Sequence, residues 1–185
     1  MITGKRIRLR AISKDDLPQY IVWLNDPDVF RNTSLFAPLS MEQEEQWYRD
    51  TLAHPVEEQP LAIEVKTDGG WKLVGNVGLM NFDQRIRSAE IGIFIGDKSY
   101  WDKGYGTEAM QLILGFGFGS VNLNRIYLRV FETNPRGIHC YENVGFQLEG
   151  RMRQAHYLDG KYIDVLLMSI LKNEWLGNNM KEGHK

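Results

Sequence analysis

Residues 100–109 read YWDKGYGTEA and mark the point where a predicted strand passes into a long helix. Gly104 and Gly106 would let the backbone approach a ligand closely. The helix begins near Thr107, and the N–H groups of its first turn have no acceptor within the helix. Together with the positive end of the helix dipole, these groups favour an anion such as a diphosphate. An ordinary strand-to-helix loop explains the two glycines equally well.

Two other phosphate-binding motifs do not fit this chain. A Walker loop needs Lys followed by Ser or Thr directly after its last glycine, whereas Thr107 and Glu108 follow Gly106. Glycines 115, 117 and 119 fall inside the predicted helix and lack the preceding strand of a dinucleotide-binding fingerprint. We therefore disfavour a nucleotide triphosphatase and interpret these three glycines as positions of close packing.

The segments on either side of the loop predict a parallel pair of strands. Residues 89–95 and 125–131 are rich in β-branched and aromatic side chains, as strands are. The intervening helix, 107–121, is long enough for a right-handed crossover, which makes the two strands parallel neighbours.

The rest of the chain adds antiparallel strands and two leading helices. Ser13 and Ser40 suit the N-caps of helices that end near Asp26 and Pro55. Further strands are predicted at 6–12, 61–66, 71–81 and in a long hairpin within 146–171 that turns at Asp159–Gly160. We therefore predict an α/β fold with a central mixed, mostly antiparallel sheet flanked by helices. No linker or repeat divides it, so residues 1–185 are predicted to form a single domain.

The composition excludes several classes of protein. Of the 185 residues 43% are hydrophobic, which favours a globular fold, and the formal net charge of −2 gives no general attraction to nucleic acid or anionic membranes. The single cysteine, Cys140, cannot form an intramolecular disulfide, and the first residues lack the order of a signal peptide. We therefore expect a cytoplasmic protein with no nucleic-acid or membrane partner.

Residues 134–146 read NPRGIHCYENVGF and predict a short helix with clear ends. Asn134 suits the N-cap, Pro135 the first helical position and Gly145 the left-handed residue after the last turn. The loop KGYGTEA, followed about 25 residues later by Asn-x-x-Gly-x-x-x-Tyr-x-x-x-Gly-Phe, resembles the GNAT superfamily of acetyl-CoA-dependent N-acetyltransferases. The resemblance covers essentially the whole chain. Within the superfamily, the chain is similar to the branch that contains ribosomal-protein alanine N-terminal acetyltransferases and spermidine acetyltransferases.

This resemblance implies a GNAT-like domain that binds acetyl-CoA as co-substrate beside the parallel strand pair, mainly through main-chain groups. The implied cofactor-binding residues are Ile93, Phe94, Ile95, Trp101, Asp102, Lys103, Gly104, Tyr105, Gly106, Thr107, Asn134 and Arg136. Asn134 would reach the pantetheine arm, although as a helix cap it needs no ligand. The superfamily commonly has Gln or Arg three residues before its first loop glycine, where this chain has Trp101, a residue familiar there in this branch.

By the same resemblance, Tyr141 is the phenol that protonates the leaving thiolate of CoA. It lies seven residues after Asn134, which is about two turns along the same helix. Without the resemblance, a tyrosine in the core or at its rim is the simpler explanation.

Direct attack on a thioester requires a neutral amine, so a base or a water chain is needed at neutral pH. Glu90 is the leading candidate, because it projects opposite Ile91 and Ile93 from a strand expected to be internal. The alternative is a salt bridge with Arg85, Arg87 or a lysine of a neighbouring strand.

Glu132, at the end of the next parallel strand, is the second candidate base. His139 and His156 are weaker candidates, since the first is expected on an exposed helix face and the second in a strand. Neither histidine has the company of other metal ligands, so no metal is expected.

The acceptor is the least determined part of this interpretation. We expect a primary amine, first a protein N-terminus of the ribosomal-protein type, and alternatively a polyamine, an amino sugar or an antibiotic amine. Acidic residues that would attract a cation, or else form a solvated helix face, are Glu42, Glu44, Glu45, Asp50, Glu57 and Glu58. Aromatic residues that would line an acceptor slot, or else the core, are Trp23, Phe30, Phe36, Trp47 and Tyr48.

Two further alternatives stay open from the sequence. A non-catalytic acetyl-CoA-binding module would carry the same loop, with Tyr141 and Glu90 serving only in packing. Exposed edges of the predicted sheet could also pair across a homodimer.

Overall fold

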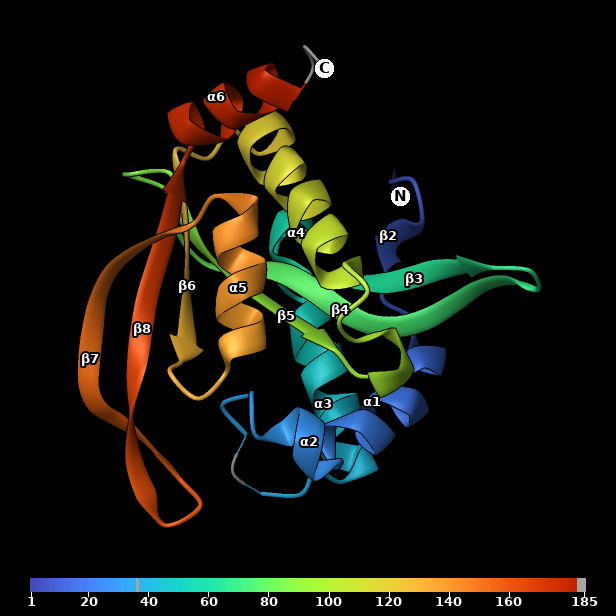
Figure 1. Ribbon diagram of the computed structural model, residues 1–185. Coiled ribbons are helices and arrows are strands. Elements are labelled where there is room, and N and C mark those ends of the chain that lie inside the picture. Colours follow the sequence, from blue (N-terminus) through green and yellow to red (C-terminus); the bar gives the residue numbers. More distant parts are fainter. Residues whose placement is uncertain (36, 183–185) are drawn as a thin grey trace.

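The computed structural model describes residues 1–35 and 37–182, the last five of these by their backbone. Within them, eight strands form one sheet in the order β1-β2-β3-β4-β5-β6-β8-β7 (Figure 1). The strands are β1 (Ile2–Thr3), β2 (Ile7–Ala11), β3 (Leu61–Thr67), β4 (Gly70–Asp83), β5 (Ser88–Ile95), β6 (Arg125–Phe131), β7 (Gln147–Leu158) and β8 (Lys161–Leu171). Among the strands of these described residues, only β5 and β6 pair in parallel. The predicted mixed, mostly antiparallel sheet is confirmed.

Helices cover both faces of this sheet (Figure 1). They are α1 (Leu17–Leu24), α2 (Pro27–Phe30), α3 (Met41–Leu52), α4 (Tyr105–Gly115), α5 (Pro135–Val144) and α6 (Lys172–Glu182). Adjacent residues of β3 demonstrate the two faces, because Ile63 packs into the cluster beneath α4 while Ala62 packs with Tyr20 and Trp23 of α1. In this described part of the chain, no helix combines the length and apolarity needed to cross a bilayer.

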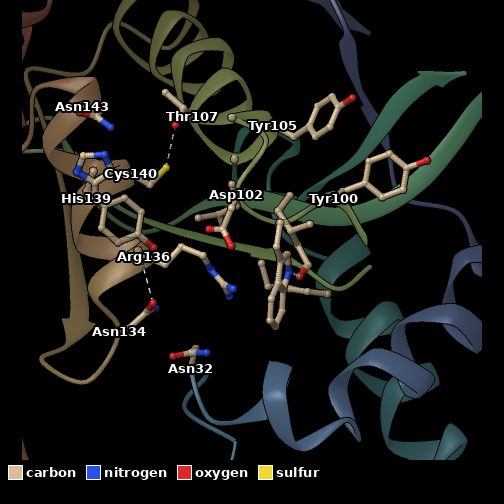
Figure 2. A pocket seen from close by; sticks show the side chains of 18 of the residues that line it. Asn32, Tyr100, Asp102, Tyr105, Thr107, Asn134, Arg136, His139, Cys140 and Asn143 are labelled. Carbon is tan, nitrogen blue, oxygen red and sulfur yellow. Dashed lines mark hydrogen bonds between the residues drawn. The ribbon is translucent and has the colours of Figure 1, made fainter. Parts of the chain in front are cut away.

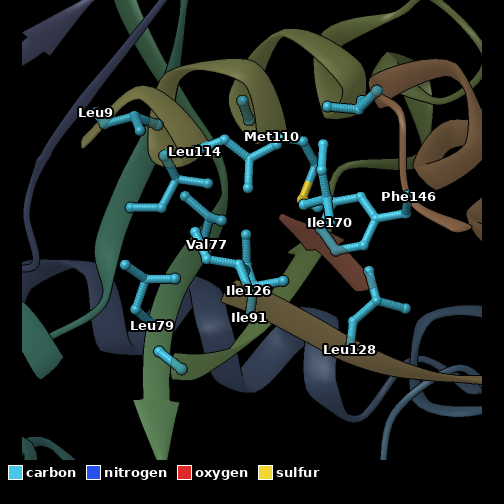
Figure 3. Packing of buried hydrophobic residues seen from close by; sticks show 14 of the residues in the cluster. Leu9, Val77, Leu79, Ile91, Met110, Leu114, Ile126, Leu128, Phe146 and Ile170 are labelled. Carbon is cyan, nitrogen blue, oxygen red and sulfur yellow. The ribbon is translucent and has the colours of Figure 1, made fainter. Parts of the chain in front are cut away.

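The larger apolar cluster fixes α4 to the sheet (Figure 3). Met110 and Leu114 of α4 are fully buried against Val77 of β4 and Ile126 of β6. Burial of such side chains stabilises a fold by roughly 1.5–3 kcal/mol each. This packing matters for function because it holds the first turn of α4 at the end of β5.

The predicted helix caps are confirmed where they depend on local sequence. Ser13 and Ser40 each form a capping box, with Asp16 and Gln43 as their partners. The predicted helix at 107–121 instead starts at Tyr105 and ends in a π-helical turn, Phe116–Ser120. Of its three glycines only Gly117 is closely packed, since an added Cβ would lie 2.7 Å from Ile126 Cδ1.

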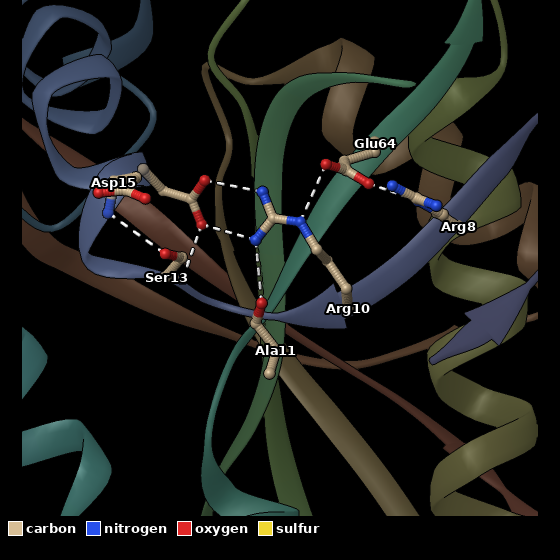
Figure 4. A network of polar contacts seen from close by, with 7 residues as sticks. Arg8, Arg10, Ala11, Ser13, Asp15 and Glu64 are labelled. Atoms are coloured by element: carbon tan, nitrogen blue, oxygen red, sulfur yellow. Dashed lines mark hydrogen bonds and ion pairs between the residues drawn. The ribbon is translucent and has the colours of Figure 1, made fainter. Parts of the chain in front are cut away.

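A buried ionic network joins β2, β3 and the start of α1 (Figure 4). The Arg10 guanidinium donates to both carboxylate oxygens of Asp16, at 2.8 and 2.7 Å, and to Glu64 at 2.9 Å. Arg8 donates to the other oxygen of Glu64. Burial would raise the pKa of Glu64, but the hydrogen bonds from the two arginines outweigh it and lower that pKa. The network therefore holds the Glu64 carboxylate ionised within the fold.

Candidate active site

The sheet opens between its two parallel strands. Residues Ser88–Glu90 of β5 pair with Arg125–Tyr127 of β6, and the pairing stops there. β5 continues to Ile95 beside β4, whereas β6 continues to Phe131 beside β8. Strand edges without a neighbour keep unpaired N–H and C=O groups. We call this opening the fork, and its edges offer main-chain hydrogen bonds to a ligand.

A cavity of about 410 Å³ lies where the end of β5 meets α2, α4 and α5 (Figure 2). Of the twelve residues predicted to bind cofactor, all except Lys103 line it, and Tyr141 lines it as well. Sequence reasoning did not predict the other lining residues as cofactor-binding, namely Val29, Asn32, Thr33, Tyr100, Gly137, His139, Cys140 and Asn143. Of these, it considered His139 only as a weaker candidate base. The structure thus brings the two sequence motifs to one place, with the end of α2 as a third wall.

The glycine loop presents the amino end of α4 to this cavity. Asp102 and Gly104 adopt left-handed backbone conformations, with φ of 56° and 79°, which turn the chain sharply into the helix. Because the N-cap is Gly104, no side chain caps the first turn of α4. The amides of the first turn are therefore available to an anion, and the helix dipole adds to their attraction.

Arg6, which precedes β2, holds this loop from behind. Its main-chain N–H and its Nε donate to the Glu108 carboxylate at 2.8 and 2.9 Å, and its Nη1 donates to the Lys103 carbonyl at 3.0 Å. Its guanidinium also lies 4.6 Å from the centre of the Tyr105 ring. Burial would raise the pKa of Glu108, but the hydrogen bonds from Arg6 lower it. The carboxylate of Glu108 is therefore an ionised anchor rather than a proton donor.

α5 supplies the opposite wall of the cavity. Asn134 Oδ1 accepts the Gly137 N–H at 2.9 Å, which is the predicted N-cap contact. The Arg136 guanidinium lies over the ring of Trp101 across the cavity. Tyr141 is half-buried, and burial raises the pKa of its phenol above the ordinary value of 10. A phenol that keeps its proton at neutral pH can serve as a proton donor.

Cys140 faces the head of α4 from the same helix. Its Sγ lies 3.4 Å from Thr107 Oγ1, and either atom can donate. Burial raises the pKa of the thiol, an effect that the Thr107 contact partly opposes. The thiol is therefore a neutral packing contact between α4 and α5.

The leading candidate base, Glu90, is buried at the fork and does not line the cavity. It accepts from Arg129 Nε at 2.8 Å, from Arg129 Nη2 at 3.0 Å and from Asn81 Nδ2 at 2.8 Å. The salt-bridge partner is thus Arg129 of β6, and the alternative partners considered from sequence, Arg85 and Arg87, are wrong. They sit near the β4–β5 turn, whereas the parallel pairing brings β6 alongside Glu90.

The second candidate base, Glu132, lies just after β6 and outside the cavity lining. It accepts from Arg151 Nη1 at 2.6 Å and from the Asp164 N–H at 2.9 Å. His156 stacks on Phe131 with ring centres 4.2 Å apart, and His139 is exposed at the cavity. Among the side chains that the structure describes, in residues 1–35 and 37–177, no group of three or more is suited to hold a metal ion.

The acidic and aromatic residues of the leading helices that the structure describes lie outside the lining of this cavity. Glu44 is buried, Glu45 pairs with Lys14 and Arg49, and none of the acidic residues of α3 lines the cavity. The aromatic residues Trp23, Trp47 and Tyr48 pack together as core. Phe30 borders a separate hollow, and Phe36 lies outside the described residues.

Comparisons with known proteins agree with this arrangement. Residues 6–147 match the family described as an acetyltransferase (GNAT) domain. A spermidine N(1)-acetyltransferase of Vibrio cholerae is 30% identical over 177 residues, covering 95% of this chain and 99% of that protein. A putative ribosomal N-acetyltransferase, YdaF of Bacillus subtilis, is 35% identical over 105 residues, or 57% of each protein.

Solved structures include the spermidine N-acetyltransferase of Vibrio cholerae in complex with CoA and spermine. It superposes with a TM-score of 0.84 at 28% identity, over 94% of this chain and 99% of that chain. The family match spans most of the chain and includes the strands of the fork and the residues that line the cavity. The chain belongs to the GNAT acetyltransferase family and is an acetyl-CoA-dependent N-acetyltransferase.

Proposed function

We propose that this enzyme transfers the acetyl group of acetyl-CoA to a primary amine of a polyamine such as spermidine. The observation that carries the proposal is the match, over nearly the full length of both chains, to an enzyme solved with CoA and spermine. It favours a polyamine over the protein N-terminus that the sequence first suggests. A non-catalytic module has no comparable support, since the relatives named above are N-acetyltransferases.

The lining of the cavity fits acetyl-CoA. The first-turn amides of α4 and the guanidinium of Arg136 would bind the diphosphate, because both are hydrogen-bond donors with positive character. Ile93 and Ile95 would flank the pantetheine arm, whose amides match the free main-chain groups of β5. Asn134 keeps its Nδ2 hydrogens for the same arm while its Oδ1 caps α5. Acetyl-CoA would supply the activated acetyl thioester.

The chain's own acid and base would act from opposite faces of the sheet. Tyr141 packs with the cluster beneath α4, whereas Glu90 projects to the other face beside Arg129. Tyr141 would deliver a proton to the departing sulfur as the amine nitrogen bonds to the acetyl carbon. Glu90 would take the proton that the attacking amine loses, directly or through a water, and Glu132 is the second candidate for this task. In this proposal the fork would be the passage between the two groups.

A second candidate function is acetylation of a protein N-terminus. It is favoured by the 35% identity with the putative ribosomal N-acetyltransferase and by the neutral wall that α2 contributes to the cavity. Asn32 and Thr33 line that wall, and among the carboxylates only Asp102 lines the cavity. An N-terminal amine needs no strongly acidic site, whereas a polyamine carries several positive charges.

Release of CoA thiol from acetyl-CoA, measured over a panel of acceptors, tests the proposal. We expect turnover with spermidine and spermine to exceed turnover with basic peptides that start with alanine or serine, and with amino sugars, by at least tenfold. Preference for a peptide would replace the proposed acceptor with the second candidate. Silence with every amine, together with tight CoA binding, would favour a binding module.

Domain organisation and assembly complete the proposal. One sheet holds strands from both ends of the described chain, which supports a single domain over residues 1–185. We propose that this domain acts in the cytoplasm. β7 lies at the sheet edge and exposes Leu148, Met152 and Tyr157, which supports a homodimer through this edge. Light scattering, measured as the protein elutes from a size-exclusion column, would give its molar mass and so distinguish a monomer from a dimer.

A further inference from the structure

Arg129 reaches back across the fork at the point where strand pairing stops. The last paired residues are Glu90 of β5 and Tyr127 of β6, so Arg129 is the second residue of β6 beyond the pairing. Its guanidinium nevertheless binds the Glu90 carboxylate through both oxygens, at 2.8 and 3.0 Å. A side-chain bridge thus continues the connection between the strands where the backbone connection ends.

The geometry of this bridge is fixed on both sides. The Glu90 side chain is 10% exposed and Arg129 is 53% exposed, so the carboxylate is anchored inside and the guanidinium covers it from solvent. Planar, two-point contacts between Arg and a carboxylate fix orientation as well as distance. The bridge also raises the pKa of Arg129, chiefly through the hydrogen bond with Glu90, so its charge is constant.

Asn81 completes the support of the carboxylate from β4. Its Nδ2 donates to Glu90 Oε2 at 2.8 Å, and its backbone is left-handed, with φ of 53°. It lies where the register of β4 and β5 shifts, between Met80 and Asp83. A non-glycine residue in this conformation is uncommon and is kept where the surroundings require it. In this protein the left-handed conformation of Asn81 directs its side-chain amide toward Glu90.

We propose that Arg129 is a positioning residue for acetyl transfer, which sets the width of the fork and orients Glu90 toward the incoming amine. The inference rests on the proposed function, because it assumes that the amine reaches the fork. Glu90 accepts three hydrogen bonds from the protein and still has lone pairs left, since a carboxylate offers about four acceptor positions. Arg129 and Asn81 determine which of these positions faces the acceptor.

The test compares Arg129→Gln and Arg129→Lys with Arg125→Gln. Arg125 is a matched control because it lies on the same strand and face and pairs with Glu149, but at the other end of β6. We expect Arg129→Gln to lower kcat at least tenfold while KM for acetyl-CoA and Kd for CoA change less than twofold. Arg129→Lys keeps the charge but not the two-point contact and should recover only part of the rate. Arg125→Gln should keep wild-type kcat.

Hydrogen exchange gives a second readout that needs no turnover. Without the bridge the short parallel pairing should fray, so amides of residues 88–95 should exchange at least tenfold faster in Arg129→Gln than in Arg125→Gln. Unchanged exchange would overturn the proposed control of the fork, and wild-type kcat in Arg129→Gln would overturn the positioning role. Failure of the proposed function differs from both, because wild-type protein would then prefer a peptide or be silent with every amine while the exchange difference remained.

Discussion

The Arg136 guanidinium lies 3.6 Å from the centre of the Trp101 ring, and the indole Nε1 donates to the Ile95 carbonyl at 2.7 Å. These contacts join α5, the glycine loop and the end of β5 across the cavity. Trp101→Ala should therefore loosen two walls at once and raise Kd for CoA by roughly 30-fold, from about 2 kcal/mol of lost stacking and hydrogen bonding. Calorimetric titration with CoA measures this.

Trp71→Ala is the matched control for that variant. Trp71 also lies beneath an arginine, with Arg8 4.5 Å from its ring centre, but on β4 and outside the cavity lining. We expect its Kd for CoA to stay within twofold of wild type. Equal losses of affinity in both variants would show that stacking supports the fold rather than the cofactor site.

Tyr141→Phe should remove the proposed proton donor and little else. General acid catalysis contributes roughly 10²- to 10⁴-fold, so kcat should fall at least 100-fold while Kd for CoA stays within twofold. Because burial raises the pKa of Tyr141 above 10, the phenol keeps its proton and the wild-type rate should show no loss from Tyr141 up to pH 10. Tyr162→Phe, at an exposed position on β8, is the control. An alkaline loss of rate below pH 10 that vanishes in Tyr141→Phe would contradict the raised pKa, and wild-type kcat in Tyr141→Phe would contradict the role as proton donor.

Glu44 should make stability depend on pH in the opposite sense to most carboxylates. It is 5% exposed, and burial raises its pKa from 4.5 to about 7. Between these values the unfolded chain releases a proton that the folded chain keeps, so the free energy of unfolding falls as pH rises from 4.5 to 7. The total change is about 3 kcal/mol. Urea unfolding at pH 4.5, 6 and 8 measures it.

Glu44→Gln should abolish this dependence and stabilise the protein at pH 8 by up to about 3 kcal/mol, because no charge then has to be buried. Glu45→Gln is the control, since Glu45 is partly exposed and paired with Lys14 and Arg49. Should Glu44→Gln destabilise the protein at pH 8, Glu44 must make a favourable ionic contact instead.

Arg10→Met should destabilise the fold by about 3 kcal/mol, because it leaves the buried Asp16 carboxylate without its two-point partner and Glu64 with only Arg8. Arg10→Lys should restore little, since a lysine cannot bind two carboxylates in that planar geometry. Arg31→Met removes an exposed pair with Asp159 and should cost less than about 1 kcal/mol. Urea unfolding compares the three variants, and wild-type stability of Arg10→Lys would refute the argument.

Local signals predicted much of the fold. Asn134, Pro135 and Gly145 lie at the cap positions of α5 that their chemistry favours, because each effect needs only neighbouring residues. The same signature at Asp26 and Pro27 begins α2, which sequence reasoning missed by treating that proline as the end of the preceding helix. Considering Asp26–Pro27 as the start of a new helix, as well as the end of the preceding one, would have predicted α2.

The site was predictable only where a motif carried it. The loop and α5 were recognised, but Asn32 and Thr33 have no motif and reach the cavity through tertiary packing of α2. Glu90 was correctly expected to be buried, yet its partner Arg129 lies 39 residues away and is brought near by strand order. Pairing across the sheet depends on the whole fold, and no local pattern encodes it.

The anchorage of the glycine loop by Arg6 has a consequence for how the protein folds. Its contacts with Lys103 and Glu108 close loops of about 100 residues, so they can form only after the intervening sheet and α4 have assembled. The glycine loop should therefore be among the last parts to become rigid. By linkage, CoA binding should slow exchange of the β2 amides, although β2 does not line the cavity.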